Sequence, residues 1–198
     1  MKDINDITVC MYGAAREDID PKYIEQVYEL GKQIAARGWK LIYGGGASGL
    51  MGAIARGVKD NGGYVIGVVP TWMDQREPVF EADTVIKTDN MADRKKIMED
   101  NADAFIVCPG GVGTLDEFFQ ILTLKDLSRQ PKPIVLFNID GFYDGLVEFI
   151  KEGAEKNFIR ENVVDMFCTR DSVDAVLRRI GGEIVEKAVG QAIKDAVG

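Results

Sequence analysis

A glycine-rich turn between an apolar run and a helical segment is the part of the sequence best suited to chemistry. The turn starts at Pro109 and carries Gly110, Gly111 and Gly113, followed by Thr114. Glycine permits backbone angles that other residues avoid and lets a ligand approach the main chain closely. Because the turn leads into the start of a helix, free N–H groups and the helix dipole favour a bound anion. A tight turn without a ligand is the alternative, but the three glycines and the adjacent hydroxyl favour a phosphate.

Three charged side chains belong with this predicted phosphate site. Glu117 falls in the first turn of the helix, where a carboxylate gains from the helix dipole and would lie beside a bound phosphate ester. It is either a catalytic carboxylate or an ordinary helix-start glutamate, and spacing alone leaves both open. Arg94 and Lys95 fall in the first turn of another predicted helix, where a cation is unfavourable. Each therefore requires an anionic partner, either a ligand or a nearby carboxylate, and we favour a ligand.

Composition narrows the chemistry and the partners. The chain has 32 acidic and 24 basic residues and a net charge of -8, which opposes binding to nucleic-acid polymers and to anionic membranes. A nest of backbone N–H groups can still attract a small anion. The chain has no histidine and no Cys-x-x-C pair, which excludes histidine-based catalytic pairs and zinc clusters. We expect no metal and no cofactor.

The cysteines and the apolar runs indicate a soluble cytoplasmic protein. Cys10, Cys108 and Cys168 are widely spaced in apolar, strand-like sequence, which suits reduced thiols better than a disulfide framework. No apolar run at the start of the chain has the length of a signal peptide, and none elsewhere approaches about 18 residues. The sequence therefore predicts no processing and no membrane partner.

Apolar runs alternate with helical segments along the chain. This alternation predicts an α/β fold, a Rossmann-like, doubly wound, mostly parallel sheet of about seven strands flanked by helices. We expect one domain over residues 1–198, with a helical tail over about 183–198 that Gly190 weakens and that packs on the body or on a second copy. Residues 71–82 show no periodic element and are interpreted as a mobile loop over a site. Asp20, Ser48 and Asn90 are expected to cap the helices that follow them. The predicted strands are 7–12, 40–43, 64–69, 84–87, 104–108, 133–137 and one near 167, and the predicted helices are 21–38, 49–61, one from 91, 114–126 and 142–156.

This topology brings the charged and glycine-rich segments together. In an open parallel sheet, ligands bind at the carboxyl ends of the strands. Gly13 follows the first predicted strand, Arg94 and Lys95 follow the fourth, and the turn from Pro109 follows the fifth. We therefore expect these segments to converge around one crevice.

A second glycine run, residues 44–49, formally satisfies the dinucleotide pattern G-x-G-x-x-G. That pattern belongs after the first strand and requires an acidic residue about 20 positions later, where this chain has Val69. A nicotinamide cofactor is therefore disfavoured, and Gly45 and Gly46 are interpreted as part of a turn that shapes the rim of the ligand site. Neither glycine run ends in Gly-Lys-Ser or Gly-Lys-Thr, so a Walker A loop is absent.

Three motifs taken together carry a resemblance to a known family. Tyr43-Gly44-Gly45-Gly46 with Gly49-Leu50-Met51-Gly52, Met91 with Arg94-Lys95, and the run from Pro109 to Glu117 resemble the Lonely Guy (LOG) family over about residues 9–158. The members of that family are nucleoside 5'-monophosphate phosphoribohydrolases that release cytokinin bases. The resemblance implies that Arg94 and Glu117 are catalytic. It implies substrate-binding roles for Lys95, Gly110, Gly111, Gly113, Thr114 and Thr123, and Glu77 matches a substrate-contacting glutamate of the family.

The resemblance also implies a reaction and a partner. The N-glycosidic bond of AMP or of a cytokinin riboside monophosphate would be hydrolysed to the free base and ribose 5-phosphate. Ala92, the run Gly13-Ala14-Ala15 and Leu124 depart from the pattern by removing polar or aromatic groups near the rim, which favours AMP over a cytokinin-type substrate. Relatives form homodimers, and a set of apolar residues offers either a shared face or the protomer's own core. That set is Ile97, Met98, Phe118, Ile121 and Leu122.

Two other readings accompany the resemblance. A nucleotide-binding or molybdenum-cofactor carrier on the same scaffold is the alternative function, but a carrier does not need Arg94 together with Glu117. The label lysine decarboxylase, often attached to the family, lacks support because the sequence shows no context for a lysine that binds pyridoxal phosphate. Phe118 and Phe119 are interpreted as core residues rather than as base-stacking residues.

Overall fold

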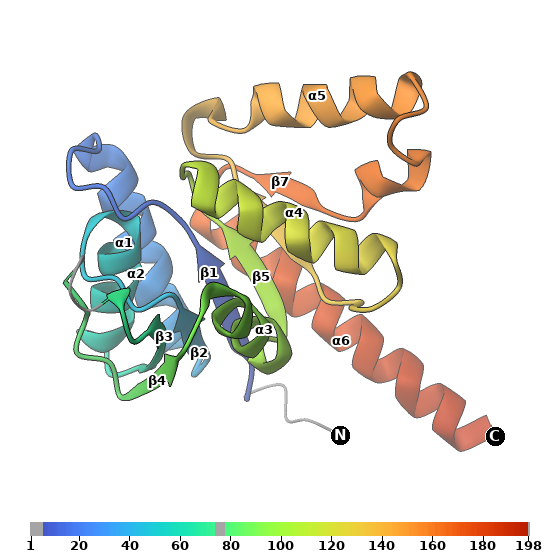
Figure 1. The fold of residues 1–198 in the computed structure, drawn as a ribbon. Coiled ribbons are helices and arrows are strands. Elements are labelled where there is room, and N and C mark those ends of the chain that lie inside the picture. The colour runs from blue at the N-terminus through green and yellow to red at the C-terminus, as the bar shows by residue number, and fades with distance from the viewer. Residues whose placement is uncertain (1–5, 74–77, 198) are drawn as a thin grey trace.

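The computed structural model describes residues 6–73 and 78–197, which form an α/β fold around one seven-stranded sheet (Figure 1). All six pairs of neighbouring strands are parallel, in the order β4-β3-β2-β1-β5-β6-β7. The chain builds outward from β1 to β4 and then returns to place β5 on the other side of β1. This is the doubly wound arrangement expected from the sequence, with its switch point between β1 and β5. The strands are β1 (Thr8–Tyr12), β2 (Lys40–Tyr43), β3 (Tyr64–Pro70), β4 (Thr84–Thr88), β5 (Ala104–Val107), β6 (Ile134–Phe137) and β7 (Cys168–Arg170).

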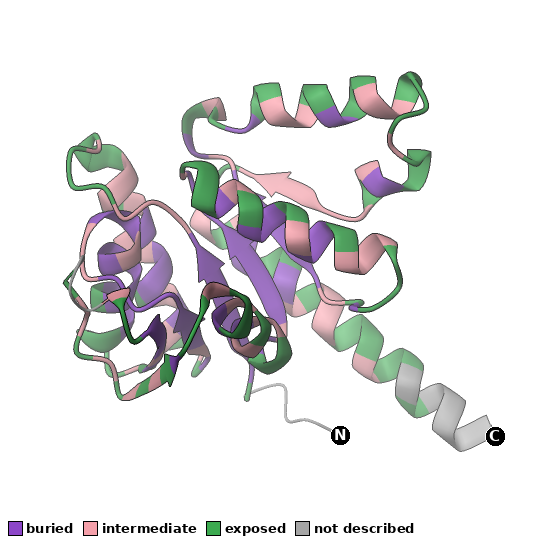
Figure 2. Ribbon diagram, in the orientation of Figure 1, coloured by how far each residue is buried: buried purple, intermediate pink, exposed green. Residues whose placement is uncertain are grey.

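Helices cover both faces of the sheet, so the central strands are apolar along their whole length. On β1, Val9 and Met11 face one core cluster, and Cys10 and Tyr12 face the other. The first cluster lies under α1 (Pro21–Ala36), α2 (Gly49–Lys59) and the start of α6 (Val173–Val197). The second lies under α3 (Met91–Asn101), α4 (Val112–Asp126) and α5 (Asp144–Glu155). Figure 2 shows the buried residues gathered in the strands and on the helix faces that meet them.

The carboxyl ends of β1 and β5 are level and their loops are tied together. The two strands pair in register from Val9 opposite Ala104 to Tyr12 opposite Val107. Beyond them, the N–H of Ala14 donates to the carbonyl of Pro109 at 3.1 Å. The loop after β1 therefore lies against the glycine-rich turn that leads into α4.

Two of the three expected helix caps are confirmed. The side chain of Asp20 accepts the N–H of Lys22 at 3.0 Å and caps α1. The side chain of Asn90 accepts the N–H of Asp93 at 2.9 Å and caps α3, as expected. The prediction that Ser48 caps α2 is wrong, because its hydroxyl makes no cap hydrogen bond and donates instead to Glu17 at 2.7 Å. A tertiary partner has replaced the local one.

The C-terminal helix starts earlier than expected. The tail predicted over about 183–198 is the second half of α6, which runs unbroken from Val173. Val176, Leu177 and Ile180 are buried against the sheet, and this packing offsets the cost of glycines inside the helix. Ile184 still packs against the first cluster and Lys187 donates to the carbonyl of Pro131, whereas the end of α6 extends away from the body (Figure 1). The helix predicted over 142–156 starts two residues later, at Asp144, because a short 3-10 turn, η2 (Ile139–Gly141), comes before it. A second 3-10 turn, η3 (Glu161–Asp165), precedes β7.

Within the residues that the structure covers, no helix combines the length and the apolar character needed to cross a membrane.

Candidate active site

A cavity of about 670 Å³ opens at the carboxyl edge of the sheet. Its walls come from the loops after β1 and β2, from the starts of α3 and α4, and from the segment around residues 73 and 78. Pockets of roughly 300–1,000 Å³ are typical of sites for small molecules. The expected convergence is confirmed, because Gly13, Arg94, Gly111 and Glu117 all line this one cavity.

The start of α4 faces the cavity without a side-chain cap. Gly111 occupies the N-cap position, and glycine has no side chain with which to cap the first-turn N–H groups. A methyl group built on Gly111 or Gly113 would meet no atom within 4 Å, so the packing of this protomer does not require glycine at either position. Gly110 differs, since a Cβ there would lie 2.1 Å from Oγ1 of the buried Thr114. The helix start therefore offers free N–H groups and open space to an anion.

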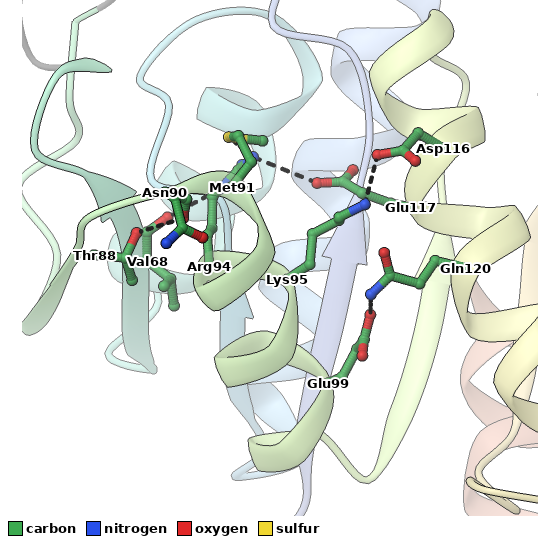
Figure 3. Close-up of polar contacts among 10 residues, drawn as sticks. All are labelled: Val68, Thr88, Asn90, Met91, Arg94, Lys95, Glu99, Asp116, Glu117 and Gln120. Atoms are coloured by element: carbon green, nitrogen blue, oxygen red, sulfur yellow. Dashed lines mark hydrogen bonds and ion pairs between the residues drawn. The ribbon is translucent and has the colours of Figure 1, made fainter.

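Arg94 crosses the cavity floor from α3. Its side chain is buried, with the residue only 6% exposed, and its Nε donates to the carbonyl of Val68 at 3.1 Å. Nη1 lies 3.5 Å from Oε1 of Glu117 (Figure 3). A Cβ on Gly44 would lie 1.6 Å from Nη2 of Arg94, so the first glycine after β2 makes room for this guanidinium. The sequence left open whether Arg94 pairs with a ligand or with a nearby carboxylate, and the structure places the carboxylate of Glu117 beside it.

Glu117 is a buried carboxyl group beside a buried cation. The residue is 8% exposed, and burial raises its pKa to about 7; Arg94 acts in the opposite direction. Asp116 raises the pKa further, and Lys95 lowers it. A carboxyl group that titrates near neutral pH can take up or release a proton under working conditions, as catalytic acids and bases do. The expectation that Glu117 falls in the first turn was wrong, because α4 begins at Val112 and has no acidic residue in its first turn. An ordinary helix-start glutamate would point into solvent, whereas Glu117 is buried, so the geometry favours the catalytic interpretation.

Two further contacts join α3 to α4 next to this pair (Figure 3). The ammonium of Lys95 lies 2.8 Å from Oδ2 of Asp116. One turn further along both helices, the side-chain amide of Gln120 donates to the carboxylate of Glu99. Lys95 was expected to bind the nucleotide, but the structure directs its ammonium to Asp116, and the cavity wall includes Asp116 rather than Lys95.

The other predicted site residues divide into four groups. Gly13, Gly46 and Thr114 line the cavity, whereas Gly45 and Gly110 form the turns behind its wall; Gly45 has a φ of +80° that suits glycine. Thr123 is exposed and lines a separate groove between α4 and α5, so the protomer does not bring it to the cavity. Glu77 lies outside the described residues. The centre of the loop predicted over 71–82 also lies outside the described residues. Near the end of that loop, the N–H of Phe80 donates to the carbonyl of Gly45.

Sequence reasoning missed two parts of the wall. Three methionines line the cavity; Met51 and Met91 stood in the quoted motifs without a role, and the loop residue Met73 had no signal. Arg16 and its acidic neighbours Glu17 and Asp18 also line it. Their position directly after the first strand was the signal that could have found them, because loops at that edge of a parallel sheet face the ligand.

The thiols and carboxyl groups outside this site do not suggest further chemistry. Cys10 and Cys108 are buried and unpaired, and burial raises the pKa of each thiol, so neither is an activated nucleophile. In the part of the chain that the structure covers, no three Cys, Asp or Glu side chains are grouped so that they could hold a metal ion.

The apolar set expected to form either a shared face or a core belongs to the core. Met98, Phe118, Ile121 and Leu122 are buried in the protomer's own second cluster, and Ile97 packs against it. The core interpretation was right for Phe118 and wrong for its neighbour Phe119, which is 37% exposed on the outer side of α4.

Comparisons with known proteins identify the family of this chain. A family model described as "Possible lysine decarboxylase" matches residues 51–180. The chain is 40% identical to a cytokinin riboside 5'-monophosphate phosphoribohydrolase of Mycobacterium tuberculosis, over 87% of this chain and 92% of that protein. It is 36% identical to cytokinin riboside 5'-monophosphate phosphoribohydrolase LOG of Oryza sativa subsp. japonica, over 92% of this chain and 76% of that protein.

A solved structure shares the fold. The molybdenum cofactor carrier protein of Chlamydomonas reinhardtii superposes with a TM-score of 0.71, covering 91% of this chain and 99% of that chain at 24% identity. At this identity the likeness concerns the fold alone. The family model spans more than half of the chain, and the two curated relatives are above 30% identical over most of it. The chain therefore belongs to the Lonely Guy (LOG) family.

Proposed function

We propose that this protein is a nucleoside 5'-monophosphate phosphoribohydrolase. Water would cleave the N-glycosidic bond of the nucleotide and release the free base and ribose 5-phosphate. The observation that carries the proposal is the buried pair of Arg94 and Glu117, 3.5 Å apart, in the wall of a cavity that also contains the uncapped start of α4. The curated relatives named above carry this activity in their names.

The phosphate would bind at the start of α4. The N–H groups of residues 112–114 lack intrahelical partners there, and the helix dipole adds a favourable field. Open space at Gly111 and Gly113 supports this placement, because glycine is present where the packing of the protomer would accept a methyl group. The hydroxyl of Thr114 supplies one more donor at the same point.

Glu117 would perform the chemistry one turn further along α4. Departure of the base leaves positive charge on the ribose ring, and an ionised carboxylate stabilises this transition state. The same carboxylate can orient the attacking water and accept its proton. With a pKa of about 7, Glu117 is largely ionised above neutral pH and ready to take a proton from water as the bond to C1' forms. The N-glycosidic bond breaks as the base departs, and the proton held by Glu117 then passes to the base, which restores the carboxylate.

Arg94 would fix the reacting groups relative to one another. Its Nε is held by the carbonyl of Val68, so the guanidinium cannot swing away from Glu117 without losing a buried hydrogen bond. Its remaining donors would hold the phosphate or the departing base. A fixed geometry of this kind makes attack effectively unimolecular, which lowers the barrier.

AMP is the substrate we propose for this site. Met51, Met73 and Met91 line the cavity and suit the flat face of a purine, because methionine adapts to the shape of its neighbour. Ala14 and Ala15 also line the cavity and present no hydroxyl groups to a substituent on the base, which supports adenine over a decorated purine.

Release of adenine from AMP, measured by liquid chromatography, tests the proposal. Glu117→Gln should abolish release, whereas Glu148→Gln, an exposed position on α5, should leave the rate unchanged. Nucleotide binding without release of base by the unmodified protein would favour the carrier alternative. Absence of both binding and release would refute nucleotide recognition at this site.

Three further expectations accompany this function. We propose a homodimer, supported by large apolar side chains exposed on α4, on α5 and just after them: Phe119, Leu127, Phe149 and Phe158. Sedimentation or light scattering measures its mass. We propose a cytoplasmic location, supported by unpaired buried cysteines. We also propose that residues 1–198 form a single domain, supported by the one sheet that all seven strands share.

A further inference from the structure

The contacts between α3 and α4 form a regular series. Arg94 faces Glu117, Lys95 faces Asp116, and Glu99 faces Gln120 (Figure 3). The second and third contacts are separated by four residues on each helix, which is about one helical turn. The helices are therefore joined by side chains at the level of the catalytic pair and one turn beyond it.

Lys95 is placed to join helices rather than to bind a ligand. Its side chain is 15% exposed, whereas that of Asp116 is 57% exposed. The aliphatic stem is thus covered between the helices, and the ammonium emerges at the carboxylate of Asp116. Asp116 lines the cavity and Lys95 does not. Any effect of Lys95 on the site therefore passes through Asp116 or through the field of its charge.

Among the described residues, charged and titratable groups from α3, α4 and β1 face Glu117. Arg94, Lys95 and Glu99 belong to α3 and Asp116 to α4, while Cys10 and Tyr12 on β1 are the groups whose own titration feels Glu117. Lys95 and Asp116 act on the pKa of Glu117 in opposite directions, because Asp116 raises it and Lys95 lowers it. Their effects offset each other while both are present.

We propose that Lys95 and Asp116 are a positioning pair. Their contact holds α3 against α4 so that Arg94 stays opposite Glu117. The positive charge of Lys95 also balances the negative charge of Asp116 beside the carboxylate of Glu117. The consequence for catalysis rests on the proposed function, whereas the consequence for Glu117 itself does not. Lys95 is assigned no direct contact with the phosphate.

Removing one member of the pair should shift the pKa of Glu117 in a direction set by the charge that remains. Lys95→Met leaves an unbalanced carboxylate and should raise the pKa of Glu117. Asp116→Asn leaves an unbalanced ammonium and should lower it. We expect shifts on the order of half a unit, smaller than those from a charge in direct contact. The double variant should return close to the original value, and Lys95→Arg should preserve it.

Carbon-13 NMR titration of the glutamate side-chain carboxyl groups measures this without substrate. The resonance of Glu117 is assigned by its loss in Glu117→Gln. Lys96→Met is the matched control, because Lys96 is the next residue on α3, carries the same charge and pairs with Asp100 on its own helix. It should leave the titration of Glu117 unchanged. Thermal melting of each variant checks that the fold is intact.

The pH dependence of kcat/KM for AMP is the second readout. Its acid limb should move up in Lys95→Met and down in Asp116→Asn, and general damage to the site would not move it in opposite directions. Shifts in the same direction, or no shift, would overturn the inference. So would a rise in KM for Lys95→Met with the titration of Glu117 unchanged, the pattern of a ligand contact. Opposite NMR shifts in a protein that never releases base would leave the pair in place and remove the proposed function.

Discussion

Replacing Glu117 by glutamine should change how stability depends on pH. The carboxyl group has a reference pKa of 4.5 and a folded-state pKa of about 7, with burial as the main cause. The folded protein therefore binds this proton more tightly than the unfolded chain does. The stabilising contribution is complete below about pH 4.5 and is lost as pH rises through about 7.

The size of the effect follows from the shift. About 2.5 units at about 1.4 kcal/mol per unit correspond to about 3 kcal/mol between the two ends of the window. The residue is 8% exposed, so solvent screening does not reduce this figure greatly. Glutamine does not titrate, and arginine stays charged throughout the range, so any altered contact with Arg94 adds the same offset at every pH.

Urea unfolding at several pH values from 4.5 to 8 gives the free energy of unfolding for both proteins. The difference between variant and original should move by about 3 kcal/mol in favour of Glu117→Gln as pH rises. Glu148→Gln, at an exposed position, should show a flat difference. A flat difference for Glu117→Gln as well would mean that the folded-state pKa is ordinary, and the interpretation of a buried, poised carboxyl group would fail.

Three other substitutions test the geometry of the site. Gly113→Ala and the control Gly145→Ala both place a methyl group in open space on a helix, so each should raise the free energy of unfolding in urea by up to about 1 kcal/mol. Only Gly113→Ala should also raise KM for AMP. Equal KM values for the two variants would contradict phosphate binding at α4. Gly44→Ala should displace the guanidinium of Arg94 and lower kcat on the order of 100-fold, since its Cβ would lie 1.6 Å from Nη2; steady-state rates equal to the original would refute this reason for the glycine. Arg94→Lys keeps the charge but cannot contact the carbonyl of Val68 and Glu117 together, so kcat should fall although the cation remains, and full activity would mean that charge alone suffices.

Much of the fold follows from local patterns. Apolar runs such as Thr8–Tyr12 and Ala104–Val107 are buried strands because helices cover both faces of the sheet. The rule that ligands bind at the carboxyl ends of parallel strands then placed Gly13 and Gly111 at one cavity. These predictions depend on repeating physical periods, which one sequence is enough to show.

The partners of the charged residues could not be predicted in the same way. The contact of Arg94 with Glu117 depends on how α3 and α4 pack, and nothing in the spacing of either helix determines it. For the same reason Lys95 was assigned to a ligand, although Asp116 lies within reach. The glycine run 44–49 was interpreted as a turn at the rim, but its spacing gave no sign that its first residue, Gly44, also leaves room for Arg94. Tertiary proximity decides each of these roles.

The central claim is that the start of α4 holds the phosphate while Glu117 cleaves the glycosidic bond. A single-turnover measurement on Glu117→Gln, with protein in excess over AMP and adenine quantified after rapid quenching, tests it most directly. The dependence on protein concentration gives the affinity, and the plateau gives the chemical rate. We predict an affinity close to that of the original protein and a rate lower by about 100-fold or more. Release of adenine at the original rate would contradict the claim.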